Sequence, residues 1–545
     1  MEPLAELDRF NLDPEVKLQL STLMSSLLQQ SHAQLAEKTS LLEQSANIIA
    51  EKETKIAALS HELAYYKRIR FGQKTEALAG LQRDLFREDV ETDLAAIEAE
   101  LDALKATPRA TVAAPRSPRR GRQPLPEHLP RIEHRHEPAN CTCGQCGGKL
   151  SHIRDDITEQ LDVEPAKFYI HRHIRPQYAC RACETVIAET VPPAIIDGGL
   201  AAVGLLAWVV IGKYLDHSPL YRLEQIAGRS GVNLSRSTLA DWVGQVGVAL
   251  QPLVDRLIWH LLQGNTLHAD ETPMPQLAPG NGKTKKAYLW AYRSNDLQPG
   301  PRMIVFDYRS GRNGQHARDF LGDWRGCLMV DDYAGYKPLF TEVSGGKVCT
   351  ELACFAHVRR KFFDLFKANQ SPMAYAALEQ IADLYEIESQ AKNLSIEQRQ
   401  LVRQDKAKPL LEELHTWLQD TLAKTAPGGA SAKALNYALK RWPALIRYAD
   451  TGHLPIDNNA CENTIRPIAI GRKNYLFVGT ERAGKRAAAI QSLLGTAKLN
   501  GLDPAAWLKE TLEKLPTWPN SKIDELLPFG HNETANTTKN FREYG

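Results

Sequence analysis

The sequence lacks any long hydrophobic run. Its most apolar stretch, residues 201–210, is about half as long as a helix that spans a bilayer. The first residues, Met1-Glu-Pro-Leu, also lack the basic and then apolar segments of a secretory signal peptide. We therefore expect a cytoplasmic protein that has no membrane partner.

The sequence also lacks an excess of either charge. Its 67 Lys and Arg residues nearly balance its 65 Asp and Glu residues, which leaves a formal net charge of +2. Any binding of nucleic acid must therefore depend on local clusters of basic residues. Two such clusters lie at residues 67–76 and 116–122. Either could contact phosphate, although a basic helix end and a solvated linker explain the two clusters equally well.

The cysteines do not have the even count of a secreted disulfide framework. There are nine, and five of them lie between residues 141 and 183. Two CxxC pairs stand out there, and such pairs are typical of a zinc ribbon in a reducing compartment. We predict a structural Zn²⁺ held by Cys143, Cys146, Cys180 and Cys183, with Cys141 as a competing ligand.

Proline and glycine are absent from residues 28–63, where aliphatic residues recur at every seventh position. The seam consists of Leu28, Leu35, Leu42, Ile49, Ile56 and Leu63. A heptad seam predicts a coiled coil, here one that joins copies of the chain into a homo-oligomer. A long solvated helix and an internal hairpin with residues 90–104 are the alternatives.

Residues 220–229 and 235–242 resemble a helix-turn-helix. Ser235 is placed to cap the second helix. Arg236 and Thr238 then lie in its opening turn, the part that reaches base edges in DNA-binding motifs of this kind. Plain packing of two helices is the alternative to DNA contact.

Three acidic residues from distant segments carry the main functional prediction. Asp270 and Asp331 end short apolar runs, and Glu462 lies within a helical segment. A carboxylate at the end of a buried strand requires an explanation. Oxygen ligands from separate segments predict a site for hard divalent cations. Two Mg²⁺ ions held about 3.5–4 Å apart in this way would support cleavage of a phosphodiester.

Each acid also has a simpler interpretation. Asp270 and Asp331 could cap turns, and the adjacent Glu271 and Asp332 could be the ligands instead. Glu462 could pair with Arg466, one helical turn later. Because Pro467 follows, we expect the helix to end or kink there.

The order of predicted elements around the acids indicates a fold. Strands at about 266–273, 287–292 and 303–308 precede a helix at 315–323 and a strand that leads to Asp331. Three strands, a helix and a fourth strand, with acids on the first and fourth strands, are typical of a ribonuclease-H-like core. The long interval before Glu462 has a helical pattern at about 371–448, so we predict a helical insertion there.

Over nearly its whole length the chain resembles the transposases of the insertion sequence 66 family. The resemblance rests on the coil, the paired CxxC motifs, the helix-turn-helix segment and four motifs: His268-Ala-Asp-Glu-Thr-Pro, Asp331-Asp-Tyr-Ala-Gly-Tyr, Cys354-Phe-Ala-His-Val-Arg-Arg-Lys-Phe and Asn458-Asn-Ala-Cys-Glu-Asn-Thr-Ile-Arg-Pro. It implies that Asp270, Asp331 and Glu462 are a catalytic Asp-Asp-Glu triad that binds Mg²⁺ or Mn²⁺. Terminal repeats and target DNA would be the partners, and other proteins of the element could take part.

Basic residues on either side of Glu462 are then candidate phosphate contacts. Those in the predicted site are His357, Arg359, Arg360, Arg466, Arg472 and Lys473. Arg482, Lys485 and Arg486 are further candidates. A solvated helix face is the alternative for the group at 357–360.

We thus predict a multidomain α+β protein, a bacterial DNA transposase that cleaves and joins strands. A non-catalytic DNA-binding regulator and a structure-specific nuclease are the competing functions. In chain order the predicted regions are 1–105 (coiled coil), 106–131 (Pro- and Arg-rich linker), 132–195 (zinc ribbon), 196–260 (helix-turn-helix-like segment), 261–500 (catalytic core with its insertion) and 501–545 (helix and loose tail).

Overall fold

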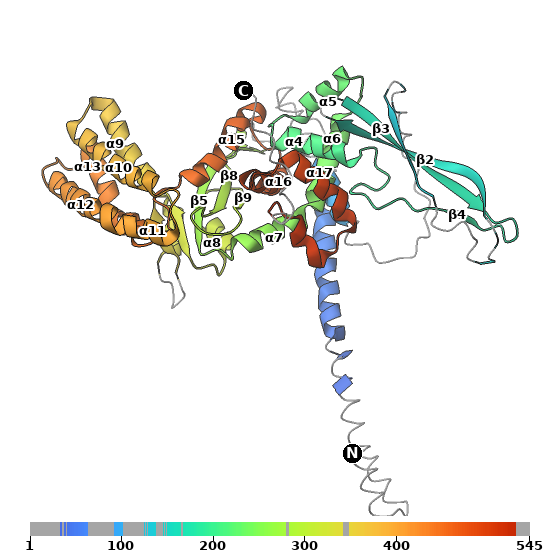
Figure 1. The fold of residues 1–545 in the computed structure, drawn as a ribbon, viewed down its shortest axis with the longest axis horizontal. Coiled ribbons are helices and arrows are strands. Elements are labelled where there is room, and N and C mark those ends of the chain that lie inside the picture. The colour runs from blue at the N-terminus through green and yellow to red at the C-terminus, as the bar shows by residue number, and fades with distance from the viewer. Residues whose placement is uncertain are drawn as a thin grey trace, which may run out of the picture. The chain divides into compact units, whose positions relative to one another are not determined.

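The computed structural model describes residues 33–34, 38–39, 41–63, 92–101, 125, 127, 129–137, 145–146, 148, 150–164, 167–278, 283–341 and 348–529 (Figure 1). They belong to two compact units, an N-terminal unit from 1–71 and 97–113 and a main unit from 72–96 and 114–545. Cys141, Cys143, Leu28, Leu35 and both basic clusters lie outside the described residues.

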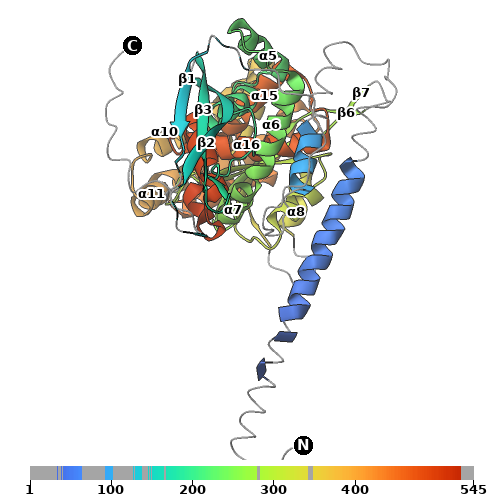
Figure 2. The same ribbon diagram turned by 90° about the vertical axis from the view of Figure 1, so that its right-hand side faces the viewer.

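In the N-terminal unit, residues 41–63 form one continuous helix (Figure 2, blue). The seam residues Leu42 and Ile49 are 71% and 56% exposed. An aliphatic seam left this open costs free energy in water, because apolar surface stays hydrated. Self-association through this seam remains a prediction.

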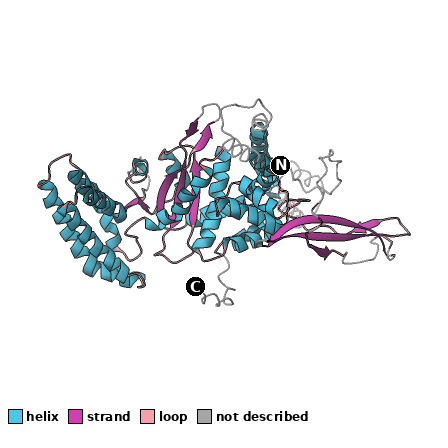
Figure 3. Cartoon of the chain, turned by 90° about the horizontal axis from the view of Figure 1, so that it is seen from above, coloured by secondary structure: helices cyan, strands magenta, loops and turns pink. Residues whose placement is uncertain are grey.

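A twisted sheet forms the region of the paired cysteines. It is built on a long antiparallel hairpin of β2 (Ser151–Glu164) and β3 (Lys167–Ala179) (Figure 3). β1 (Arg131–Arg135) and β4 (Val186–Ala188) pair with β3. Near the hairpin turn, Ile170 is buried in the main core, whereas the end with the cysteines buries little besides Leu150 and Cys180.

Four helices follow: α4 (Val203–Tyr214), α5 (Leu220–Arg229), α6 (Arg236–Ala249) and α7 (Gln251–Leu261). The turn after α5 uses Gly231 at φ 72°, a conformation that glycine adopts without strain. Ser235 caps α6, since its hydroxyl accepts a hydrogen bond from the Thr238 amide at 3.1 Å. The predicted helix pair and its cap are therefore confirmed.

The centre of the main unit is a mixed five-stranded sheet with strand order β11-β10-β5-β8-β9. β5, β8 and β9 are antiparallel, whereas β10 is parallel to both β5 and β11. The strands are β5 (Thr266–Pro273), β8 (Tyr288–Ser294), β9 (Ile304–Arg309), β10 (Cys327–Val330) and β11 (Thr350–Ala353).

Smaller elements connect these strands. The predicted helix before β10 is present as α8 (Gln315–Leu321). A 3₁₀ helix, η2 (Ala334–Leu339), follows β10, and the short strands β6 (Gln276–Ala278) and β7 (Lys283–Lys285) pair with each other.

Helices cover the antiparallel half of the sheet. α15 (Asn459–Tyr475) packs on β5 and β8, and α16 (Glu481–Leu499) packs along β9. The hydroxyl of Ser492 accepts a hydrogen bond from the Phe306 amide at 2.7 Å, so α16 satisfies backbone groups that an edge strand leaves open. α15 continues past Pro467, so the helix does not end there. The other expected outcome, a kink at Pro467, remains a prediction.

The predicted insertion is helical and has its own apolar core against α9 (Phe355–Asn369) (Figure 1, gold and orange). Its elements are α10 (Pro372–Gln390), α11 (Ile396–Val402), the π-helical turn η3 (Arg403–Ala407), α12 (Lys408–Ala423), α13 (Ala430–Lys440), α14 (Trp442–Ile446) and η4 (Arg447–Asp450).

The C-terminal region is more ordered than expected. After α17 (Pro504–Lys514) and η5 (Leu515–Thr517), the 3₁₀ helix η6 (Asn520–Leu526) buries Leu526 in the main core. Asp524 accepts a hydrogen bond from Arg256 Nε at 2.6 Å. The loose tail predicted within residues 501–545 is therefore wrong as far as residue 529. No helix among the described residues is long and apolar enough to cross a membrane.

Candidate active site

Asp270 lies on the central strand β5, and its surroundings strongly perturb its ionisation. Burial raises the pKa of Asp270 to about 8, with further upward contributions from the negative charges of Glu271, Asp331 and Glu462. One carboxylate oxygen accepts a hydrogen bond from the Glu271 amide at 2.8 Å. Negative charge concentrated around a buried carboxyl favours the binding of a cation.

Asp331 directly follows β10, the strand parallel to β5. The carboxyl ends of neighbouring parallel strands meet at the same edge of a sheet, so the fold brings Asp331 towards Asp270. The Asp331 carboxylate accepts a hydrogen bond from the Tyr333 amide at 2.9 Å, which orients it in the turn after the strand.

Glu462 lies in the first turn of α15 and faces α9. Its Oε2 atom accepts a hydrogen bond from Arg360 Nη2 at 3.3 Å, and its Oε1 atom lies 3.6 Å from His357 Nδ1. Its ion pairs within the described residues are with these two side chains and not with Arg466, which is exposed. Two of the predicted phosphate contacts therefore neighbour the third acid.

The two competing acids have other partners. Glu271 accepts hydrogen bonds from Arg312 Nε and from the Tyr336 hydroxyl, both at 2.7 Å. The exposed Asp332 lies 3.7 Å from Arg441 Nη1. Since a metal would have to displace Arg312 from Glu271, the geometry favours Asp270 as the ligand on β5.

Asn458, the residue before α15, joins that helix to the sheet. Its Oδ1 atom lies 2.9 Å from His268 Nδ1, and its Nδ2 atom donates to the Ala269 carbonyl at 3.0 Å. Its backbone amide donates to Cys354 Sγ at 3.2 Å. One fully buried side chain thus links the segments that position Asp270 and Glu462.

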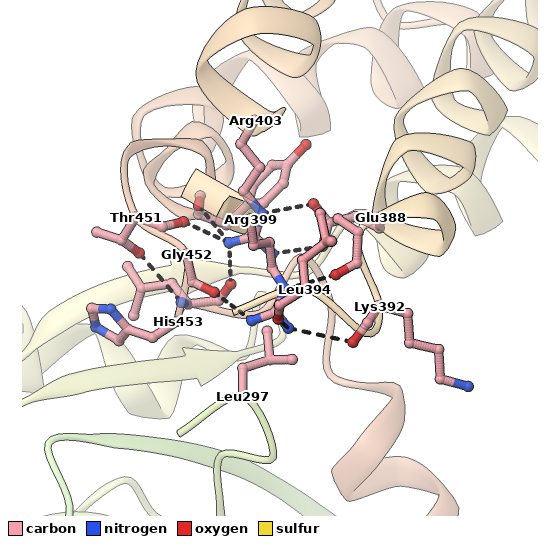
Figure 4. Close-up of polar contacts among 12 residues, drawn as sticks. Leu297, Glu388, Lys392, Leu394, Arg399, Arg403, Thr451, Gly452 and His453 are labelled. Atoms are coloured by element: carbon pink, nitrogen blue, oxygen red, sulfur yellow. Dashed lines mark hydrogen bonds and ion pairs between the residues drawn. The ribbon is translucent and has the colours of Figure 1, made fainter. Parts of the chain in front are cut away.

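The loop that leads into α15 is held by two buried arginines of the insertion (Figure 4). Arg403 donates from Nη1 to the carbonyls of Tyr448, Thr451 and Leu454 at 2.7–2.9 Å, and from Nε to Glu388 at 2.8 Å. Arg399 donates to the Gly452 carbonyl at 2.7 Å.

This arrangement could not be predicted from the sequence. The spacing of the two arginines, one helical turn apart, was its only local signal, and charged pairs at that spacing are usually solvated. Arg403 also lies in a π-helical turn, a feature often found near functional sites.

The remaining predicted phosphate contacts have different environments. Arg359 and Arg360 line an open groove of about 590 Å³ together with Phe363 and Tyr385. Arg472 donates to the backbone carbonyl of Pro273, at the end of β5.

Lys473 is exposed, at the C-terminal end of α15. Lys485 pairs with Glu481 at 2.9 Å. The prediction is wrong for Arg486, which is buried and forms an ion pair with Asp93 at 2.9 Å. A buried, paired guanidinium is not available to phosphate.

In the helix-turn-helix segment, Arg236 and Thr238 occupy the opening turn of α6 as predicted. Arg236 forms an ion pair with Glu224 of α5 at 3.1 Å, and both side chains are 37% exposed. The Thr238 hydroxyl contacts the Ser235 hydroxyl at 2.9 Å. Contact of these side chains with DNA remains a prediction.

Three of the four predicted zinc ligands come together. The sulfur of Cys146 lies 3.2 Å from that of Cys180 and 3.7 Å from that of Cys183. The three sulfurs form one of two compact groups of ligand atoms among the described residues. Since Cys143 lies outside those residues, its place in the site remains a prediction.

The other compact group consists of Cys354, His357 and Glu462, whose ligand atoms all lie within 4.8 Å of one another. The three acids of the predicted triad do not form a group that compact. Their donor set nevertheless fits a hard divalent ion, because all donors are carboxylate oxygens and the Glu462 Oε1 atom is buried without a hydrogen-bond partner.

Comparison with family models places most of the chain in one family. The model described as "Transposase IS66 family" matches residues 198–486. Three further models, "Transposase C of IS166 homeodomain", "zinc-finger binding domain of transposase IS66" and "IS66 C-terminal element", match residues 58–133, 140–184 and 492–529.

Similar proteins are matched along most of their length. The uncharacterized protein y4qI of Sinorhizobium fredii (strain NBRC 101917 / NGR234) is 36% identical over 495 residues, 88% of this chain and 90% of that protein. The uncharacterized protein y4jD of the same strain is 35% identical over 483 residues, 86% of this chain and 94% of that protein. This chain belongs to the IS66 family of transposases.

Proposed function

We propose that the protein binds the terminal repeats of its insertion sequence, cleaves DNA strands there and transfers the released ends to target DNA. The observation that carries this proposal is the convergence of Asp270, Asp331 and Glu462 from β5, the end of β10 and the start of α15. The raised pKa of Asp270 supports it, because the other two acids contribute to that shift.

We assign a ribonuclease-H-like core to the central sheet. Its support is the topology: three antiparallel strands, β5, β8 and β9, followed by β10 and β11 on the other side of β5 and parallel to it. In this arrangement the first and fourth strands are adjacent, so acids on both strands reach one edge of the sheet.

Asp270, Asp331 and Glu462 are the residues that would hold the divalent metal, for which Mg²⁺ or Mn²⁺ is the proposed identity. Such ions, when bound, supply a more acidic water and neutralise charge on the leaving oxygen. The chain's own contribution is to orient the carboxylates: Asn458 and Arg403 fix the start of α15, and Arg360 and His357 lie beside Glu462.

The other regions are assigned to recognition and assembly. Cys146, Cys180 and Cys183, with Cys143, would hold a structural Zn²⁺ that stabilises an end of the β2–β3 hairpin with almost no apolar core. Arg236 and Thr238 would contact DNA, and the exposed seam of residues 41–63 would join copies of the chain.

Strand transfer on the element's own ends tests the proposal. A labelled duplex that ends in the terminal repeat is incubated with the purified protein, a target plasmid and Mg²⁺, and both the free 3′ end and the joined product are measured. Cleavage followed by joining is the expected result. Cleavage without joining would indicate a nuclease, and binding without cleavage would indicate a regulator; either would overturn the proposal.

A further inference from the structure

Beside the proposed catalytic acids lies a cluster with a different chemistry. Cys354 is the N-cap residue of α9, His357 follows in the first turn of that helix, and Glu462 comes from the first turn of α15. The three ligand atoms lie within 4.8 Å of one another. Cys354 is only 2% exposed, whereas the side chains of His357 and Glu462 are 21% and 23% exposed, which leaves a route from solvent.

Two buried polar atoms of this cluster have no hydrogen-bond partner. His357 Nδ1 and Glu462 Oε1 are both buried without a hydrogen bond and lie 3.6 Å apart. Leaving a buried polar atom unpaired costs free energy, and a cation shared by both atoms would remove that cost. The two atoms thus face a common position next to the sulfur of Cys354.

Burial raises the pKa of the Cys354 thiol to about 12, so the thiolate requires a bound metal, and two nearby features would then stabilise it. The Asn458 amide donates a hydrogen bond to the sulfur at 3.2 Å. The sulfur also lies at the N-terminus of α9, where the helix dipole stabilises negative charge. Glu462 lies in the first turn of α15 and is stabilised in the same way.

We propose that Cys354, His357 and Glu462 form a binding site for Zn²⁺ that is separate from the cysteines of the hairpin. A thiolate, an imidazole and a carboxylate are the ligand types that Zn²⁺ combines, whereas Mg²⁺ avoids sulfur. Binding replaces the S–H bond of Cys354 with a sulfur–metal bond and releases the proton to solvent. Three protein ligands leave a fourth position open to water.

The site has a regulatory consequence that rests on the proposed function. Glu462 belongs to both sites, so Zn²⁺ at Cys354 and His357 keeps this carboxylate away from Asp270 and Asp331. Zn²⁺ therefore inhibits Mg²⁺-dependent cleavage, and replacing Cys354 relieves the inhibition.

Cobalt absorbance measures the site without any DNA reaction. Co²⁺ is added to the full-length protein as purified, and the sulfur-to-cobalt charge-transfer band is followed. The wild type is expected to bind about one Co²⁺ per chain more than Cys354→Ala, and the band of Cys354→Ala should be smaller by the contribution of one thiolate. Cys349→Ala is the matched control, because Cys349 is also buried but its sulfur contacts the Trp324 carbonyl. Equal bands in the wild type and Cys354→Ala would overturn the proposal.

Two further variants keep the thiol and guard against loss of folding. His357→Ala and Glu462→Gln are expected to weaken Co²⁺ binding about 100-fold while the thermal unfolding temperature stays near that of the wild type. If both variants bind Co²⁺ as tightly as the wild type, then Cys354 binds the metal without His357 and Glu462. That result would overturn the proposed three-ligand site. A cobalt site without DNA cleavage would refute only the proposed function; cleavage without a cobalt site would refute only this inference.

Discussion

The side chains of His268 and Asn458 meet inside the main unit, with His268 Nδ1 2.9 Å from Asn458 Oδ1. Because Asn458 Nδ2 donates to the Ala269 carbonyl, its Oδ1 atom is an acceptor and His268 must donate from Nδ1. Burial lowers the pKa of His268 to about 4, so the ring is neutral at physiological pH. This hydrogen-bonded pair holds the start of α15 against β5. His268 lies on β5, two residues before Asp270.

Replacing Asn458 is expected to separate these elements. In Asn458→Ala the His268 N–H and the Ala269 carbonyl lose a buried partner, which should reduce the free energy of unfolding by about 1–3 kcal/mol. Metal-dependent cleavage should fall more steeply than DNA binding, because Glu462 lies one turn further along. Urea denaturation and cleavage of labelled ends measure the two effects.

Asn436→Ala is the matched control for this variant. Its amide bonds only to the Ala432 carbonyl within α13, so both properties should stay near wild type. Wild-type cleavage by Asn458→Ala would show that the pair does not position Glu462.

Arg403 should be a second determinant of the position of α15. Arg403→Met leaves Glu388 and three backbone carbonyls unpaired in the interior, so we expect a loss of about 3–5 kcal/mol in the free energy of unfolding. The nearby Lys408→Met removes only an exposed ion pair with Asp450 and should cost about 1 kcal/mol or less. Equal losses in the two variants, measured by urea denaturation, would contradict this role.

Local rules explain what the sequence could predict. The cap at Ser235, the heptad seam and the strands before Asp270 and Asp331 depend on residues close in sequence, and the described structure contains the cap and the strands. The helical pattern of residues 371–448 likewise predicts the helices found there, without knowledge of their packing partners.

What the sequence could not decide depends on distant partners. Whether Glu271 or Asp270 is available to a cation is determined by Arg312 and Tyr336, which lie 41 and 65 residues from Glu271. The prediction that Arg486 contacts phosphate is wrong because Arg486 pairs with Asp93. This partner lies 393 residues away in the sequence, so no local pattern indicates it. Pro467 is tolerated inside α15, although the local rule predicts a break.

Acid should destabilise the hairpin sheet through its histidines. The rings of His134 and His136 stack on that of His173, and the ring of His171 lies tilted beside His134. Burial together with these neighbouring histidines lowers the pKa of His173 to about 4. The unfolded chain, with an ordinary pKa near 6.5, therefore takes up the proton first, and stability is lost as the pH falls from about 6.5 to 4.

Hydrogen exchange of residues 131–179 at pH 7.5 and pH 5 tests this expectation. Protection should fall at the lower pH in the wild type and fall less in His173→Gln. His152→Gln, on the same sheet, should behave like the wild type. Equal protection of the wild type at both pH values would rule out this effect.

Removing one thiolate should unfold the cysteine end of that sheet. Cys180→Ser should lose one Zn²⁺ per chain, the ion proposed for the hairpin cysteines, and lose hydrogen-exchange protection near residues 145–188, since little apolar core remains there. The central sheet should keep its protection. Cys327→Ser, at the start of β10, should retain the zinc. Full zinc content in Cys180→Ser, measured by atomic absorption, would contradict the assignment.

The choice between adjacent acids on β5 gives the sharpest test of the catalytic site. Asp270→Asn keeps the size of the side chain but removes the charge that a divalent ion requires, so cleavage should fall by orders of magnitude while binding to the terminal repeat persists. Glu462→Gln and Asp331→Asn should behave alike. Glu271→Gln should have a milder effect on cleavage, because its partners are Arg312 and Tyr336, although it should lower stability by removing the ion pair between the buried Glu271 carboxylate and the exposed Arg312. Asp332→Asn, on an exposed side chain, should be nearly neutral. If Glu271→Gln abolishes cleavage and Asp270→Asn does not, the ligand on β5 is Glu271, and Arg312 must move away from it when metal binds.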